Sequence, residues 1–236
     1  MAPKLAEAGY PAKALDAAQG IGDERYRAEA LAALALHLPE ELLHKALDAA
    51  RGIGDEWARA RALAALAPHL PEEQRAQALA EALDAARGIG RDWGRVEALA
   101  VLAPHLPEGQ RAQVLAEALS AAQGIGDPDV RARALAALAP WLPEGVLIEA
   151  LRAAQAIQWT HYRLSVLAAL APRLAELPLH TLYSLWRETL PILARRTRQD
   201  LLADIPALRP VIAKLGGPEA LVETAQAILD VTRWWP

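Results

Sequence analysis

The stretch ARGIGDEWARARALAALAPHLPE, from Ala50 to Glu72, recurs 36 residues later as ARGIGRDWGRVEALAVLAPHLPE, from Ala86 to Glu108. Its element ALDAA, or a close variant, begins at five positions that are 32, 36, 36 and 32 residues apart: Ala14, Ala46, Ala82, Ala118 and Ala150. A period of this size is typical of arrays in which each repeat packs on the next one. The repeat therefore decides the fold.

The composition of the chain favours helix. Of its 236 residues 53% are hydrophobic, and the sequence contains neither Cys nor Phe. Ala, Leu, Glu and Arg, which are good helix formers, dominate the repeats. No segment shows the strict alternation of apolar and polar residues that predicts a strand. We therefore expect an all-α protein.

Each copy of the repeat predicts two helices, here called helix A and helix B. Helix A begins at LPEE or LPEG, where proline and acidic residues suit a first turn, and ends at the glycines of GIG, such as Gly88, which we expect to adopt a left-handed conformation. Helix B begins after an Asp N-cap (Asp23, Asp55 or Asp127) and ends near a proline. The insertion QRAQ lengthens helix A by one turn at Gln74–Gln77 and Gln110–Gln113, which keeps its apolar face in phase.

The apolar positions of helix B predict how the hairpins pack. One column of equivalent positions is invariably leucine: Leu31, Leu63, Leu99, Leu135 and Leu167. A single hairpin cannot bury such a face, whereas stacked hairpins can. We expect a right-handed α-solenoid of about five hairpins over residues 14–174. Residues 1–13 are then a lead-in or truncated helix, and residues 175–236 are a C-terminal helical cap with prolines at Pro191, Pro206 and Pro218.

The segment GDPDVRARALAALA, from Gly126 to Ala139, resembles the second-helix signature of HEAT-like repeats. The resemblance covers about Ala14 to Leu174 and implies ladders between an Asp in the turn and an Arg four residues later. Arg91 and Trp159 interrupt the Asp column. The Arg column is complete and consists of Arg27, Arg59, Arg95, Arg131 and Arg163. The ALAALAPHLPE copies are also similar to the C-terminal repeat arrays of bacterial NLR-like (STAND) signalling ATPases. That resemblance implies that the chain is the sensor array of such a protein without its ATPase domain, because no GxxxxGK[ST] motif is present.

Catalytic and metal chemistry have little support in the sequence. The absence of Cys removes thiolate chemistry, and the three serines considered as nucleophiles, Ser120, Ser165 and Ser184, lie inside predicted helices. His37, His69 and His105 form one column, but neighbouring hairpins lie about 10 Å apart, which is too far for imidazoles to share a zinc ion. We expect no catalytic residue, no cofactor and no metal.

Charge and hydropathy bear on partners and location. The formal net charge is −4, which gives no global attraction to nucleic acid or to an anionic membrane. The basic segment ARRTR, Ala194–Arg198, is explained as well by a helix C-terminus as by an acidic partner. Without a long apolar stretch or a signal-peptide pattern, the chain is expected to be a soluble cytoplasmic protein.

The first turn of helix B varies most between copies. One variable column contains Arg25, Trp57, Trp93, Asp129 and His161, and the column one turn later contains Glu29, Arg61, Glu97, Arg133 and Ser165. Residues four apart share a helix face, and Trp and Arg dominate binding hot spots. We predict that a protein or peptide binds a surface here called the B-helix strip: Arg25, Trp57, Arg61, Trp93, Glu97, Asp129, Arg133 and His161.

Three alternatives remain open from the sequence. The two tryptophans of the B-helix strip could simply cover the interface between hairpins. The array could also be a HEAT-like repeat enzyme or a nucleic-acid-binding solenoid, or it could be a structural spacer or an engineered repeat scaffold. The sequence does not indicate the identity of the partner or the oligomeric state.

Overall fold

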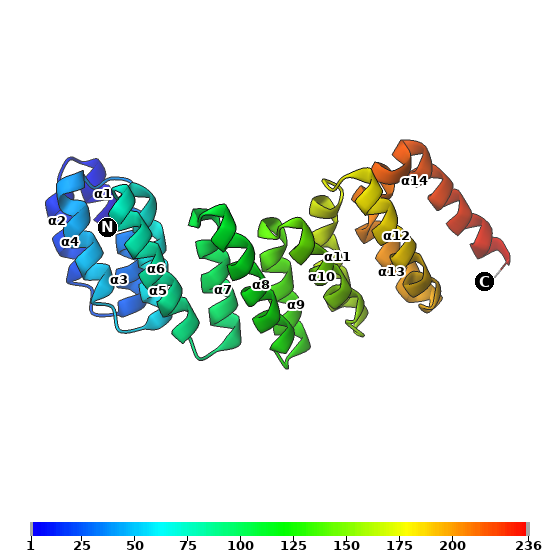
Figure 1. Cartoon of the computed structure of the whole chain (residues 1–236), viewed down its shortest axis with the longest axis horizontal. Coiled ribbons are helices and arrows are strands. Elements are labelled where there is room, and N and C mark those ends of the chain that lie inside the picture. Colours follow the sequence, from blue (N-terminus) through cyan, green and yellow to red (C-terminus); the bar gives the residue numbers. More distant parts are fainter. Residues whose placement is uncertain (1, 235–236) are drawn as a thin grey trace. The chain divides into compact units, whose positions relative to one another are not determined.

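The computed structural model describes the backbone of residues 2–234 and the side chains of residues 4–230. In this part of the chain every regular element is a helix and there is no strand, which confirms the all-α prediction. The chain forms two compact units, one extending to Ala121 and the other beginning at Ala122, and each unit is described here by itself. Figure 1 labels the helices in chain order.

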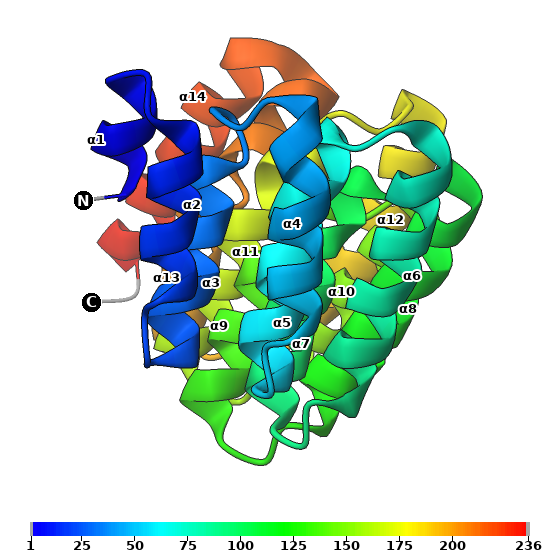
Figure 2. The ribbon, with the colours of Figure 1, turned by 90° about the vertical axis from the view of Figure 1, so that its left-hand side faces the viewer.

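The first unit consists of successive helical hairpins. Its helices are α1 (Ala2–Glu7), α2 (Pro11–Gln19), α3 (Glu24–Leu34), α4 (Glu40–Arg51), α5 (Glu56–Leu66), α6 (Glu72–Gly88), α7 (Asp92–Leu102) and the greater part of α8 (Glu108–Gly124). Helices α2, α4 and α6 pack on α3, α5 and α7, and the B helices α3, α5 and α7 also pack on one another in sequence (Figure 2). The short helix α1, which belongs to the predicted lead-in, packs on α2 and α3.

The second unit continues the hairpins and then departs from them. Its helices are α9 (Pro128–Leu138), α10 (Glu144–Gln155), α11 (Thr160–Leu174), α12 (Leu179–Ala194), α13 (Arg198–Ala207) and α14 (Arg209–Trp234). Helix α11 packs on α9 and α10 and also contacts α13 and α14 of the predicted cap. The segment around Pro206 forms two helices, α13 and α14, which are separated at Leu208. Gly217 interrupts α14 with φ 73°, so the last helical segment begins near Pro218.

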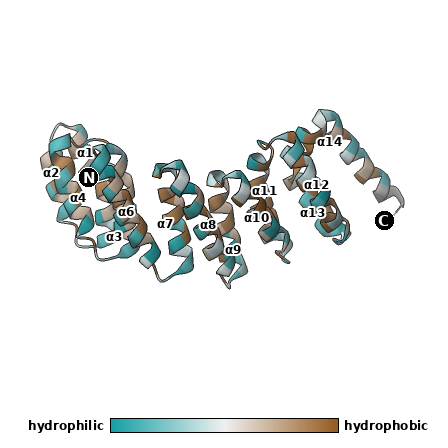
Figure 3. Cartoon of the chain, viewed as in Figure 1, coloured by the Kyte–Doolittle hydropathy of each residue, from teal (hydrophilic) through white to brown (hydrophobic). Residues whose placement is uncertain are grey.

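The inserted QRAQ turns lengthen the A helices as predicted. Helices α6 and α8 each have 17 residues, whereas α4 and α10 each have 12. The leucine column of the B helices is at most 2% exposed at all five positions. Figure 3 shows that apolar and polar residues lie on different sides of the same helices. Among the described helices none is both long enough and apolar enough to cross a membrane.

The predicted N-caps are confirmed, whereas the predicted left-handed glycines are wrong. The carboxylates of Asp23, Asp55 and Asp127 accept backbone N–H groups of the turn that follows each of them. Gly20 and Gly52 end their helices with φ −71° and −74°, and in the described chain only Gly9 and Gly217 have positive φ. The helices end in a right-handed turn whose N–H groups bond to carbonyls three and four residues earlier, so no left-handed residue is needed.

In the GIG loop that contains Gly54, glycine instead allows a side chain of the preceding hairpin to approach the backbone closely. Oε1 and Oε2 of Glu24 in one hairpin accept the N–H groups of Gly54 and Asp55 in the next hairpin, at 3.0 and 2.6 Å. A Cβ at Gly54 would lie 3.1 Å from Glu24 Oε1. These hydrogen bonds lower the pKa of Glu24 and connect successive hairpins.

Gly54→Ala is expected to lower the free energy of unfolding by more than the same change at Gly90, because the new Cβ would crowd the Glu24 carboxylate, which accepts two backbone N–H groups. Gly90→Ala is the matched control: Gly90 occupies the equivalent position one repeat later, and a Cβ there would meet nothing within 4 Å. Urea unfolding of both variants measures the difference. An equal effect at the two positions would contradict the role given to Glu24.

The complete Arg column has a common role that the sequence did not predict. Each of its five side chains donates to the backbone carbonyl of the residue six positions earlier, an isoleucine in every copy, at 2.8–3.4 Å. The Asp residues of the ladder implied by the HEAT-like resemblance instead cap their own helices. The arginines therefore fix the GIG loops onto the B helices.

The last arginine of this column connects the hairpins to the cap. Arg163 and Asp204 are both fully buried, and Arg163 Nε lies 3.0 Å from Asp204 Oδ1. Arg163 also donates from Nη2 to Asp200 at 3.1 Å. Hydrogen bonds from Thr160, Thr197 and Arg163 lower the pKa of Asp200 to about 2. A charged network thus anchors α13 on α11.

Candidate functional site

The first unit brings four of the predicted strip residues together, because Trp57 contacts Arg25, Arg61 and Glu97. The guanidinium carbons of Arg25 and Arg61 lie 5.9 and 5.2 Å from the centroid of the Trp57 ring, within the range of cation–π contacts. Trp57 Nε1 donates to Glu97 Oε2 at 3.2 Å, which joins α5 to α7. The fifth strip residue of this unit, Trp93, lies on the first turn of α7, one turn before Glu97.

The first turn of α7 lies beside the Trp57 indole. A Cβ on Gly94 would lie at an ordinary contact distance of 3.8 Å from Trp57 Cδ1, and a tighter 3.2 Å from Ile89 Cγ2 of its own hairpin. The Trp57 side chain therefore packs against the next hairpin.

The two indoles differ in exposure. Trp93 is 36% exposed, whereas Trp57 is half-buried, as the alternative that it covers the interface between hairpins would have it. Beside Trp57 is a small hollow of about 150 Å³, lined by Trp57, Arg61, Glu97, Ala98 and Val101. Val101 is 45% exposed. The strip thus contains one packed and one exposed tryptophan, and the exposed Val101 lies beside it in the hollow.

The charges of this surface are largely paired with one another. Arg61 Nη1 lies 3.3 Å from Glu29 Oε1, and Arg25 Nη2 lies 3.9 Å from Asp55 Oδ2. Both pairs connect one hairpin to the next. Because arginines and carboxylates alternate, the surface presents no concentrated charge of one sign, which a nucleic-acid phosphate backbone requires.

The remaining strip residues lie in the second unit. Asp129 and Arg133 form an ion pair one turn apart on α9. His161 is exposed on the first turn of α11, and its ring centroid lies 3.8 Å from that of Tyr162. Among the described residues no hydrogen bond, ion pair or ring contact joins His161 to the Asp129–Arg133 pair, although α9 and α11 pack on each other.

The histidine column does not form a metal site in the described residues, where no group of three potential ligands comes together. His69 and His105 end short 3₁₀ turns after α5 and α7. His37 Nε2 lies 4.0 Å from Glu7 Oε1. Burial, and secondly the charge of His69, lower the pKa of His105.

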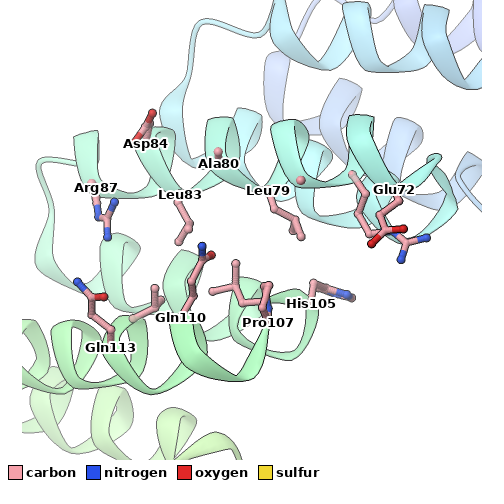
Figure 4. A pocket seen from close by; sticks show the side chains of 14 residues that line it. Glu72, Leu79, Ala80, Leu83, Asp84, Arg87, His105, Pro107, Gln110 and Gln113 are labelled. Carbon is pink, nitrogen blue, oxygen red and sulfur yellow. The ribbon is translucent and has the colours of Figure 1, made fainter.

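A second candidate surface lies on the A helices. A groove of about 630 Å³ runs between α6 and α8 and is here called the A-helix groove. Its wall on α6 is the face from Glu72 to Arg87, and the facing wall contains His105–Pro107 and Gln110, Gln113 and Val114 (Figure 4). Sequence reasoning missed this groove. The sequence feature that could have indicated the groove was the QRAQ insertion, whose two copies contribute four residues to the lining: Arg75, Ala76, Gln110 and Gln113.

The class that this fold defines is an all-helical protein of successive hairpins. No protein-family model matches the chain, and no curated protein matches its sequence. The functional assignment therefore depends on the geometry of these surfaces.

Proposed function

We propose that the chain is a right-handed α-solenoid that recognises a protein or peptide without catalysing a reaction. The binding surface is the B-helix strip. The observation that carries this proposal is the apolar surface left open on α7, where Trp93 and Val101 are 36% and 45% exposed. Large exposed aromatic side chains beside arginine are typical of binding hot spots.

The organisation of the strip supports recognition more than a spacer role. The Trp57 indole contacts Glu97 and two arginines, so the surface is ordered before a partner binds. Ordering a side chain in advance reduces the entropy lost on binding. The resemblance to NLR-like arrays suggests a role as the sensor part of a larger cytoplasmic bacterial signalling or defence protein.

Trp93→Ala is expected to weaken partner binding by about 2 kcal/mol, roughly thirtyfold in Kd, while leaving the melting temperature unchanged. A phage-displayed library of eight-residue peptides, selected on the whole chain, supplies the ligands, and calorimetry measures Kd. Trp141→Ala is the matched control, because Trp141 is 44% exposed but lies outside the strip.

Trp57→Ala is expected to behave differently from Trp93→Ala. It removes packing and a hydrogen bond, so it should lower stability by about 1 kcal/mol or more as well as affinity. Selected peptides that bind the Trp93→Ala variant as tightly as the parent would contradict the proposed surface.

A further inference from the structure

We propose that the C-terminal cap binds a small hydrophobic organic cation, such as an arylalkyl ammonium ion. The site is a hollow lined by α12, α13 and α14, here called the cap hollow. It shares no residue with the B-helix strip and does not depend on the function proposed for that strip. The proposal rests on the apolar lining of the hollow, on the one charged residue in that lining and on two aromatic side chains.

The cap hollow has the size and the chemical character of a small-molecule site. Its volume is about 510 Å³, and small-molecule sites commonly measure about 300–1,000 Å³ and are mostly apolar with a few polar groups. Leu193 and Ile212 are buried, whereas Tyr183 and Leu190 are exposed, so a ligand can enter from solvent. Six leucine and isoleucine side chains contribute to the lining: Leu190, Leu193, Leu201, Ile205, Ile212 and Leu215.

The bend of α14 brings both of its segments to the cap hollow. Gly217 separates the two segments, and the lining includes Leu215 before the bend and Ala220 after it. A Cβ on Gly216 would lie 2.6 Å from Ala220 Cβ, so glycine allows the two segments to approach this closely. The Tyr183 hydroxyl donates to the Leu215 carbonyl at 3.2 Å, which joins α12 to α14. The hollow is therefore shaped by contacts within the cap itself.

The charge of the lining favours a cation. Glu223 is the only charged residue among the described residues of the lining. Its side chain is exposed, and in the part of the chain that the structure describes it makes neither a hydrogen bond nor an ion pair. By contrast, Asp200 and Asp204 of the same cap are both paired with Arg163. A carboxylate without a partner beside apolar side chains attracts a positively charged ligand and repels an anion.

The polar groups of the lining also disfavour an anion. The Thr224 hydroxyl donates to the Ala220 carbonyl at 2.6 Å, and the Tyr183 hydroxyl donates to Leu215, so neither hydroxyl is available to donate to a carboxylate or a phosphate. Tyr183 and Trp186 lie one turn apart on α12, and aromatic faces attract ammonium groups. A ligand with one cationic head group and an apolar body matches the carboxylate, the aromatic rings and the aliphatic lining together.

The first test titrates the whole chain with three ligands that share a phenylbutyl body and differ in their head group: trimethyl(4-phenylbutyl)ammonium, 4-phenylbutanol and 4-phenylbutyrate. Isothermal titration calorimetry measures Kd. The ammonium ion is expected to bind about tenfold more tightly than the alcohol, because only the cation gains from the carboxylate and the aromatic faces, and the carboxylate ligand is expected not to bind. Equal affinity for the three ligands, or no binding of the ammonium ion at millimolar concentration, would overturn the proposal.

The second test removes the charge of the site. Glu223→Gln is expected to weaken binding of the ammonium ion about tenfold and to leave binding of the alcohol unchanged, because it removes the charge and keeps the shape of the side chain. Glu219→Gln is the matched control: Glu219 is exposed one turn earlier on the same helix but does not line the hollow, so affinity should change less than twofold. Unchanged binding in Glu223→Gln, or an equal loss in both variants, would show that the site is wrong.

A third variant tests the hollow itself. Ala194→Trp fills it from an exposed position and should weaken binding of both the ammonium ion and the alcohol at an unchanged melting temperature. Leu190→Asn, which removes an exposed apolar side chain from the lining, replaces Ala194→Trp if that variant does not fold. Binding that persists in the filled hollow would place the ligand elsewhere and overturn the proposal. Trp93→Ala should bind the ammonium ion as the parent does, so failure of the B-helix strip and failure of the cap hollow are detected separately.

Discussion

Replacing Arg163 by alanine is expected to lower the free energy of unfolding by about 3–5 kcal/mol, because it leaves a buried charge without its partner. Asp204 is fully buried, and Arg163 Nε lies 3.0 Å from its Oδ1. Arg196 is the other cation near Asp204, but its Nε is 3.9 Å from Oδ2. The variant also loses the hydrogen bond from Arg163 to the Ile157 carbonyl. Equilibrium urea unfolding followed by circular dichroism measures the loss.

A double variant distinguishes charge from general disruption. Arg163→Met with Asp204→Leu removes both charges and keeps apolar volume, so it should recover much of the stability lost in Arg163→Ala. If the double variant is as unstable as the single one, the buried ion pair is not the reason for the loss. If Arg163→Ala unfolds like the parent, the proposed anchoring of α13 on α11 is wrong.

Leu66→Asp is expected to be the most damaging substitution in the first unit, with a loss of about 4 kcal/mol or more. Leu66 is completely buried at the end of α5, where it belongs to the apolar face that packs between helices. The variant removes a large apolar side chain and places an unpaired carboxylate in the same space. Thermal unfolding should show a strongly lowered melting temperature.

Leu36→Asp is the control for this experiment. Leu36 follows α3 and is 75% exposed, so a carboxylate there remains in water and should change stability by less than about 0.5 kcal/mol. Equal melting of the Leu66→Asp variant and the parent would contradict the assignment of the core face.

The features that the sequence predicted correctly are those determined by local chemistry and periodicity. The leucine column is buried because it recurs at the helical spacing of every B helix. Asp23 and Asp127 cap their helices because the carboxylate reaches N–H groups of its own first turn. The length of α6 and α8 follows from a four-residue insertion, which is close to one helical turn.

The features that escaped prediction depend on neighbours in space. Gly54 permits the approach of Glu24, which lies 30 residues earlier, so glycine there does not indicate a left-handed turn. Trp57 is half-buried, and its Nε1 donates to Glu97 of the next hairpin, 40 residues later. The A-helix groove depends on the distance between α6 and α8, which no local pattern specifies. The partners of Arg163 come from α13, about 40 residues away.

The most direct test of the central claim is ¹⁹F NMR of the chain labelled with 5-fluorotryptophan during titration with a library-selected peptide. The chain has seven tryptophans, whose signals can be assigned with single Trp→Tyr variants. Recognition by the B-helix strip predicts that the signals of Trp57 and Trp93 shift or broaden, while that of Trp141, which is exposed outside the strip, remains unchanged. Shifts confined to Trp141, or binding that leaves Trp57 and Trp93 unaffected, would contradict the account.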